Sequence, residues 1–244
     1  AFASGIAAIS AVLLTFKSGD HVILPDDVYG GTFRLTEQIL NRFNIEFTTV
    51  DTTKLEQIEG AIQSNTKLIY IETPSNPCFK ITDIKAVSKI AEKHELLVAV
   101  DNTFMTPLGQ SPLLLGADIV IHSATKFLSG HSDLIAGAVI TNNEAISDAL
   151  YLIQNGTGNM LSAQDSWTLA KHLKTFPIRF KQSVENAQKI VSFLIKQDEI
   201  SEVYYPGLTT AHLEQAKNGG AVIGFRLADE SKAQQFVDAL TLPL

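Results

Sequence analysis

Short apolar runs alternate with longer amphipathic segments along most of this 244-residue chain. The runs are rich in β-branched residues and predict buried strands, whereas the amphipathic segments predict helices with one apolar face. The predicted strands cover 21–24, 45–50, 67–72, 96–100, 117–121 and 134–141, and the helices between them cover 30–43, 53–63 and 83–94. Because strands that alternate with helices form parallel sheets covered on both faces, we expect an α/β fold with a mostly parallel sheet sandwiched by helices.

The C-terminal part of the chain has a different pattern. Helices are predicted at 144–154, 163–174 and 178–196, and a strand at 201–205, a strand at 221–227 and a helix at 231–240 follow them. We therefore expect a large domain over residues 1–180, and over residues 181–244 a linker helix with the start of a smaller α+β domain. The chain begins without methionine and stops directly after an amphipathic segment, so we expect the natural protein to extend beyond both ends.

The first helix is predicted to begin at Ser4, which suits the N-cap position. Small residues around Gly5 let a ligand approach the backbone, and an exposed helix start offers unpaired N–H groups to an anion. The apolar first sixteen residues lack the basic start of a signal peptide, and Lys17 interrupts them before the length of a membrane span. We therefore interpret them as a buried helix.

Composition narrows the classes of partner. The net charge of −7 and the pI near 5.3 argue against nucleic acid, so a small-molecule substrate is expected. The single cysteine, Cys78, excludes an internal disulfide framework and favours a cytoplasmic location. The six histidines are scattered without metal-ligand spacing, so we predict no metal site.

Polar side chains follow three of the predicted strands, at the point where each strand ends. Asp101 comes directly after one strand, Asn76 lies in a proline-stiffened loop after another, and Lys126 follows a third. Because the carboxyl ends of parallel strands meet at one edge of a sheet, we expect these residues to lie close together. Taken alone, Lys126 is more typical of a solvated loop, and Asp101 is as typical of a helix cap or a surface turn.

The strand-end residues together match the needs of pyridoxal phosphate. This cofactor requires a lysine for a Schiff base, a carboxylate at the ring nitrogen, donors for the phosphate and a flat ring for stacking. The chain offers Lys126, Asp101, the hydroxyl groups of Ser123 and Thr125, the helix start at Gly5 and the ring of Tyr29. A dinucleotide site is disfavoured because no G-x-G-x-x-G follows the first strand, and a serine hydrolase because there is no G-x-S-x-G.

Five motifs in this order closely resemble those of the cysteine and methionine metabolism family of pyridoxal phosphate enzymes. They are SGIAA at 4–8, DVYGGTFR at 27–34, ETPSNP at 72–77, DNTFMTP at 101–107 and HSATKFLSGHSD at 122–133. The resemblance extends through YYPGL at 204–208 and is greatest for bacillus-type cystathionine β-lyases, with γ-lyases and γ-synthases close behind. It implies a fold of the PLP-dependent transferase type (fold type I) and a homotetramer with active sites shared between subunits.

The resemblance also implies roles for single residues. Lys126 and Tyr29 are the implied catalytic residues, Lys126 as the Schiff-base lysine and Tyr29 as the stacked ring and an acid or base near sulfur. The implied cofactor ligands are Gly5, Ile6, Ser123 and Thr125 at the phosphate, Asp101 at the ring nitrogen, Asn76 at the ring hydroxyl and Thr103 at the pyridine face. The family's N-terminal tyrosine and arginine, which reach a neighbouring subunit's phosphate site, and its C-terminal arginine have no counterpart in this chain.

The reaction implied is cleavage of a carbon–sulfur bond of cystathionine by β-elimination, with homocysteine, pyruvate and ammonia as products. A γ-synthase or γ-lyase of the same family is the alternative, because it shares every residue named above. A degenerate, non-enzymatic family member would be expected to have lost Lys126 or Asp101, and both are present.

Overall fold

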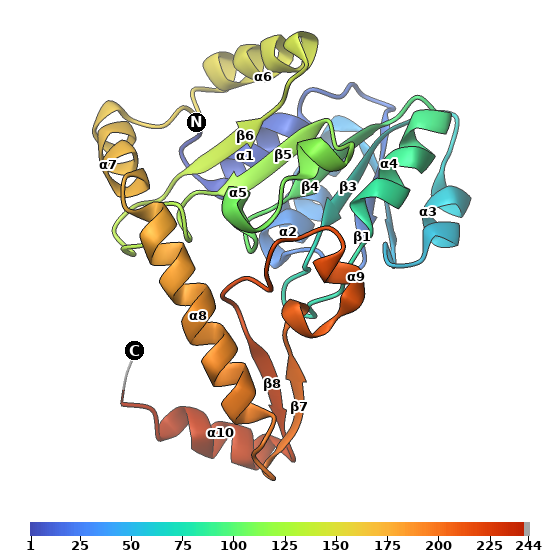
Figure 1. The fold of residues 1–244 in the computed structure, drawn as a ribbon. Coiled ribbons are helices and arrows are strands. Elements are labelled where there is room, and N and C mark those ends of the chain that lie inside the picture. The colour runs from blue at the N-terminus through green and yellow to red at the C-terminus, as the bar shows by residue number, and fades with distance from the viewer. Residues whose placement is uncertain (242–244) are drawn as a thin grey trace.

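The computed structural model describes residues 1–241, and a six-stranded sheet forms its larger part (Figure 1). The strands lie in the order β2-β1-β3-β4-β5-β6, and their bounds are β1 (His21–Pro25), β2 (Glu46–Val50), β3 (Thr66–Glu72), β4 (Leu97–Asp101), β5 (Ile119–Ser123) and β6 (Gly137–Ile140). Neighbouring strands from β2 to β5 are parallel, and only β6 runs antiparallel to its neighbour. The predicted α/β fold with a mostly parallel sheet is thus confirmed.

The strands are apolar on both faces because helices cover both. In β3, Leu68 and Tyr70 pack with α1 (Gly5–Leu13), whereas Ile69 and Ile71 pack with α4 (Ile84–Lys93). The first of these faces also receives residues of α2 (Gly30–Gln38) and α6 (Glu144–Thr157), and the second receives Ile58 of α3 (Leu55–Ala61). Each fully buried isoleucine or leucine contributes about 1.5–3 kcal/mol, so these two clusters make the sheet a rigid platform.

The segment predicted as one amphipathic helix at 30–43 differs from expectation. Helix α2 ends at Gln38 and a 3-10 turn, η1 (Leu40–Phe43), follows it. Phe33, Ile39 and Phe43 give this segment its apolar periodicity, but all three are exposed, and the buried side of α2 carries two threonines. The hydroxyl group of Thr36 bonds back to a carbonyl one turn earlier, which satisfies it inside the protein.

The remaining elements connect the main sheet to a smaller one. The short helices α5 (Thr106–Gly109) and η2 (Pro112–Leu115) lie between β4 and β5. The elements that follow α6 are α7 (Ala163–Leu173), α8 (Phe176–Leu194), β7 (Ile200–Tyr204), η3 (Pro206–Leu208), α9 (Thr210–Leu213), β8 (Gly224–Leu227) and α10 (Glu230–Asp238). Helix α8 runs from α7, beside the main sheet, to the antiparallel pair β7-β8 (Figure 1). The domain boundary at 180 stays a prediction, and residues 242–244 of the predicted second domain lie outside the described residues.

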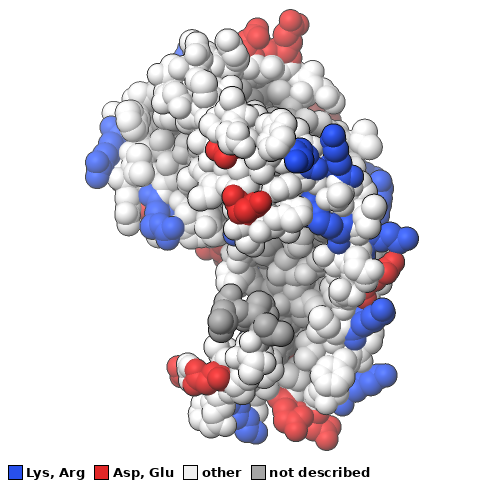
Figure 2. Space-filling view, turned by 90° about the vertical axis from the view of Figure 1, so that its left-hand side faces the viewer, with Lys and Arg blue, Asp and Glu red and all other residues white. Residues whose placement is uncertain are grey.

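Within residues 1–241, no helix combines the length and the apolar character that a membrane crossing needs. Figure 2 shows one face, on which most Lys and Arg side chains lie along the right-hand side, while Asp and Glu side chains are scattered among uncharged surface.

Candidate active site

A cavity of about 250 Å³ lies at the carboxyl ends of the parallel strands. We call it the inner cavity. Its walls contain all nine residues singled out in the sequence, namely Gly5, Ile6, Tyr29, Asn76, Asp101, Thr103, Ser123, Thr125 and Lys126. Strand β1 lies between β2 and β3, so the strand order changes direction there: β2 follows β1 on one side, and β3 to β6 follow on the other. Ligands of open α/β sheets bind beside such a switch point, because the loops diverge there and leave a crevice.

The start of α1 forms one wall of the inner cavity. Ser4 caps the helix by accepting a hydrogen bond from the N–H of Ala7 at 3.0 Å. The N–H groups of Gly5 and Ile6 have no acceptor among residues 1–241. A side-chain carbon at Gly5 would lie 2.7 Å from Cβ of Ser123, so glycine is needed for this close approach. Two unpaired N–H groups at a helix N-terminus form a site that fits a phosphate group.

The two hydroxyl groups predicted to hold the phosphate differ in what they can still donate. The hydroxyl group of Ser123 has no partner among residues 1–241. The hydroxyl group of Thr125 donates to the carbonyl of Ala136 at 3.2 Å and accepts from the N–H of the same residue at 3.0 Å. In this arrangement Ser123 is the better phosphate donor. Thr125 joins the beginning of the loop that contains Lys126 (residues 124–136, the lysine loop) to its last residue, Ala136.

Asp101 is the last residue of β4, and its carboxyl group is buried, with 9% of the residue exposed. It accepts hydrogen bonds from the backbone N–H of Thr103 at 3.0 Å, from the hydroxyl of Thr103 at 2.6 Å and from the hydroxyl of Tyr70 at 3.3 Å. Burial raises the pKa of Asp101, although these hydrogen bonds oppose the increase. A buried carboxylate of this kind is stabilised when a cationic group, such as a protonated ring nitrogen, binds beside it.

Glu72 also lines the inner cavity, and the sequence analysis did not single it out as a site residue. It ends β3 directly beside Asp101 in the register of β3 and β4. Its carboxyl group accepts from the N–H groups of Tyr29 at 3.1 Å and Asn76 at 2.8 Å. Burial and the neighbouring charge of Asp101 hold the pKa of Glu72 well above its usual range. The sequence does carry a signal for Glu72, since this charged residue directly follows the apolar run 68–71 and begins the ETPSNP motif. The other lining residues not singled out are Ser4, Ile9, Pro74, Phe104 and Ile135.

Tyr29 precedes α2 and is 47% exposed. A side-chain carbon at Gly31 would lie 2.5 Å from Cε1 of the Tyr29 ring, so the ring lies against the first turn of the helix. Only glycine at this position leaves room for that ring orientation.

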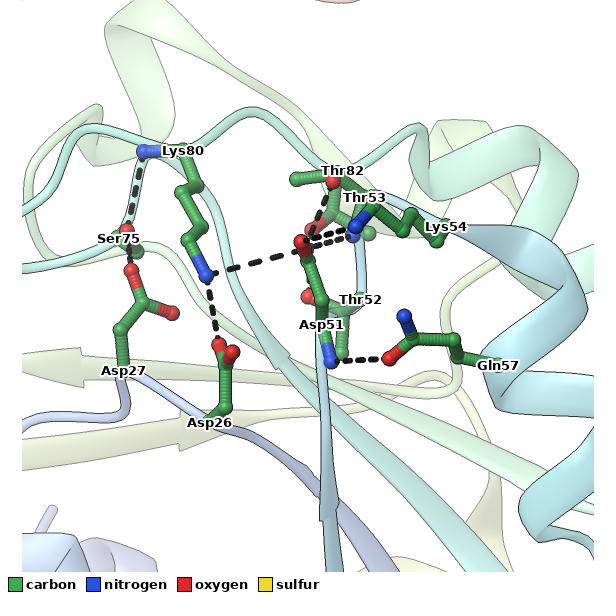
Figure 3. Close-up of polar contacts among 10 residues, drawn as sticks. All are labelled: Asp26, Asp27, Asp51, Thr52, Thr53, Lys54, Gln57, Ser75, Lys80 and Thr82. Atoms are coloured by element: carbon green, nitrogen blue, oxygen red, sulfur yellow. Dashed lines mark hydrogen bonds and ion pairs between the residues drawn. The ribbon is translucent and has the colours of Figure 1, made fainter.

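Polar contacts join the loops that carry Tyr29 and Asn76 on their outer side (Figure 3). The hydroxyl of Ser75 donates to the carboxylate of Asp27. Lys80 donates its backbone N–H to that hydroxyl at 3.0 Å, and its ammonium group lies 2.7 Å from Asp26 and 3.8 Å from Asp51. These contacts hold the loops after β1, β2 and β3 together.

Lys126 begins the loop after β5, and its side chain is exposed. Its ammonium group has no hydrogen bond or ion pair with the residues that the structure describes. Lys126 lines both the inner cavity and a larger cavity of about 1260 Å³, the outer cavity, which α8 helps to enclose. Arg179 of α8 donates to the carbonyl groups of Phe127 at 3.2 Å and Leu128 at 3.3 Å, which steadies the loop. The unpaired amine of Lys126 therefore lies where the inner cavity meets the outer cavity.

The chain matches the family model described as "Cys/Met metabolism PLP-dependent enzyme" over residues 1–244. It is 76% identical to a cystathionine beta-lyase MetC of Staphylococcus haemolyticus, over 100% of this chain and 62% of that protein. It is 50% identical to a cystathionine gamma-lyase of Bacillus subtilis, over 98% of this chain and 63% of that protein. The chain thus spans a little over three fifths of the length of these relatives.

A solved structure gives the same result for the fold. The cystathionine gamma-lyase of Lactobacillus plantarum, complexed with L-serine, superposes with a TM-score of 0.96 at 44% sequence identity. The match covers 99% of this chain and 65% of that protein. Together with the family model, this similarity confirms the resemblance that the five sequence motifs indicated.

Proposed function

Because the chain belongs to the family of Cys/Met metabolism PLP-dependent enzymes, we propose that the inner cavity binds pyridoxal phosphate and that the full-length protein cleaves cystathionine. The proposed reaction is β-elimination of homocysteine followed by hydrolysis, so that cystathionine and water give homocysteine, pyruvate and ammonia. The observation that carries the proposal is that an unpaired amine, a buried carboxylate and a helix start with unpaired N–H groups line one cavity. When bound, the cofactor supplies an aldehyde that links to amines and a ring that withdraws electrons from the substrate's α-carbon.

Different residues of the inner cavity contact different parts of the cofactor. The N–H groups of Gly5 and Ile6 and the hydroxyl of Ser123 hold the phosphate, and the carboxylate of Asp101 pairs with the ring nitrogen. The ring of Tyr29 stacks on one face of the cofactor ring, which adds about 1 kcal/mol. The side-chain amide of Asn76 has no partner among residues 1–241, whereas its backbone N–H is bound to Glu72, so the side chain is left to meet the ring hydroxyl. The hydroxyl of Thr103 bonds to Asp101 and accepts from the backbone at the end of β5, which orients the pyridine-binding wall.

Two side chains then move protons. Nζ of Lys126, at the junction of the two cavities, takes the proton from Cα of the substrate. Tyr29 is half-exposed and lines the inner cavity, and its hydroxyl group donates a proton to the departing sulfur of homocysteine. Positioned proton transfer of this kind typically contributes about 10²–10⁴-fold to a rate.

The reaction test uses full-length protein with cystathionine and measures which keto acid forms. Pyruvate is the expected product, and 2-oxobutyrate instead would identify a γ-lyase. Condensation of an acylated homoserine with cysteine, without turnover of cystathionine, would identify a γ-synthase. The β-lyase is favoured because the S. haemolyticus relative of that name is 76% identical, whereas the B. subtilis gamma-lyase is 50% identical.

The cofactor is tested separately from the reaction. Lys126→Ala should abolish both turnover and the visible absorption band of the bound cofactor, because no amine then remains at the junction of the cavities. The matched control is Lys89→Ala on the exposed side of α4, which should leave both unchanged. A Lys126→Ala protein with an unaltered visible spectrum would refute the cofactor assignment.

We further propose that full-length copies assemble into a homotetramer with shared active sites. Large apolar side chains are exposed on α6, α7 and α8, among them Tyr151, Leu152, Trp167 and Ile178. Light scattering on the full-length protein should give a tetramer mass, and a monomer would contradict the assignment.

The single exposed cysteine, Cys78, suits a reducing cytoplasm, as fractionation of cells would show.

A further inference from the structure

One carboxyl group links two residues of the inner cavity that come from different loops. Oε2 of Glu72 accepts from the N–H of Tyr29, which follows β1, at 3.1 Å. Oε1 of the same group accepts from the N–H of Asn76, which follows β3, at 2.8 Å. Both oxygens are therefore engaged, one by each loop.

Glu72 is held firmly enough to set the position of both loops. It is the last residue of β3, a strand with β1 on one side and β4 on the other, and it is 7% exposed. On the outer side, the ion pair of Lys80 with Asp26 joins half-exposed groups that water competes for (Figure 3). The hydrogen bonds to the buried carboxyl group of Glu72 are stronger and more directional than this exposed ion pair.

The choice of an acid at this position is costly for stability, which speaks against a purely structural role. Glu72 lies in register beside Asp101, so two buried carboxyl groups face each other across neighbouring strands. Burial and the charge of Asp101 both raise the pKa of Glu72, which means that the anion is disfavoured there. A neutral side chain would avoid this repulsion, but glutamine has one acceptor oxygen and could serve only one of the two N–H groups.

We propose that Glu72 is a positioning residue that fixes the Tyr29 ring and the Asn76 amide relative to each other across the inner cavity. The inference rests on the proposed function in one respect, since that function places pyridoxal phosphate between these two side chains. Glu72 thereby sets how well the cavity matches the cofactor before the cofactor arrives. Its action is indirect, through the backbone of the two residues that touch the ligand.

The test combines two variants with a control in the full-length protein. Glu72→Gln keeps the shape and removes one acceptor, whereas Glu72→Asp keeps both acceptors and the charge but shortens the reach. Glu92→Gln on the exposed side of α4 is the control. The first readout is amide hydrogen exchange without cofactor. We expect exchange to be about tenfold faster or more at Tyr29 or Asn76 in both Glu72 variants, because a buried acceptor is lost or withdrawn.

The second readout is the dissociation constant of pyridoxal phosphate, followed by absorbance. It should rise about tenfold or more in both variants, while the midpoint of thermal unfolding of Glu72→Gln falls little because the repulsion with Asp101 is relieved. Wild-type exchange at both amides in both variants would overturn the proposal, as would unchanged cofactor affinity despite faster exchange. Wild-type behaviour of Glu72→Asp alone would also overturn it, because the side-chain length that places the two acceptor oxygens would then not matter. Failure of the wild-type protein to bind the cofactor would instead refute the proposed function, and the exchange data would still decide whether Glu72 holds the two loops.

Discussion

Replacement of Gly5 by alanine tests how closely the start of α1 must approach β5. The added carbon would lie 2.7 Å from Cβ and 2.8 Å from Oγ of Ser123, and 3.1 Å from its Cα. Comfortable contacts between such atoms lie at about 3.5–4.0 Å, so the helix start has to move by roughly 1 Å. The backbone of β5 is buried in the sheet and cannot yield, so the displacement falls on the N–H groups of Gly5 and Ile6.

The expected magnitude follows from two opposing contributions. Overpacking of this kind costs about 1–3 kcal/mol, and alanine recovers at most about 1 kcal/mol of helix propensity relative to glycine. The free energy of unfolding should therefore fall by about 1–2 kcal/mol. Each charge-assisted hydrogen bond contributes about 1.5–3 kcal/mol, so loss of one phosphate contact should weaken cofactor binding by roughly tenfold to a hundredfold.

Urea denaturation and a cofactor titration of the full-length protein measure both effects. The control is Gly60→Ala in α3, where an added carbon has no atom within 4 Å and should stabilise the helix by about 0.5–1 kcal/mol. If Gly5→Ala matched the wild-type protein in both unfolding free energy and cofactor affinity, the close packing of α1 on β5 would not define the phosphate site.

Three further variants test the surroundings of the site. Gly130→Ala should cost about 2 kcal/mol or more and loosen the lysine loop, because Gly130 has a φ of +75° and an added carbon would lie 1.8 Å from Nη1 of Arg179. Thr103→Val should cost about 2 kcal/mol by removing the hydroxyl that bonds to the buried carboxylate of Asp101. Burial lowers the pKa of His122 to about 4, so the unfolded state takes up a proton first as the pH falls below about 6.5. The wild-type protein should therefore lose about 3 kcal/mol more stability than His122→Asn between pH 7 and pH 4.

Denaturant unfolding measures the free energy of unfolding of all three variants, and each variant has its own control. For Gly130, the control is Gly156→Ala in α6, where an added carbon meets nothing within 4 Å. Thr103→Ser keeps the hydroxyl and should retain most of the stability. For His122, equal slopes of stability against pH in the two proteins would show that its imidazole is not held neutral by burial.

Much of the fold could be predicted because one physical pattern dominates it. Strands buried on both faces read as continuous apolar runs, and β3 with its four consecutive buried residues from Leu68 to Ile71 is an example. Helix α2 could not be predicted in detail, because its buried side consists of Gly31, Leu35 and two threonines, which do not form an apolar stripe in the sequence. The exposed Phe33 of α2 and Phe43 of η1 show that apolar periodicity alone does not reveal which face is covered.

The candidate site could be anticipated from residue types, but its hydrogen bonds could not. Lys126 and Asp101 stand at strand ends, which periodicity locates, and the structure brings them to one cavity. The link from Glu72 to two backbone N–H groups depends on how separate loops fold back over β3, which one sequence does not specify. The same holds for Thr125, whose hydroxyl is engaged by a residue eleven positions further along the chain.

The central claim is that the amine of Lys126 forms the covalent attachment to the cofactor. The most direct test is to load the full-length protein with pyridoxal phosphate, reduce it with borohydride and locate the modified lysine by mass spectrometry of its peptides. Our account predicts modification of the peptide that contains Lys126. Modification at another lysine instead, or no stable attachment at all, would contradict it.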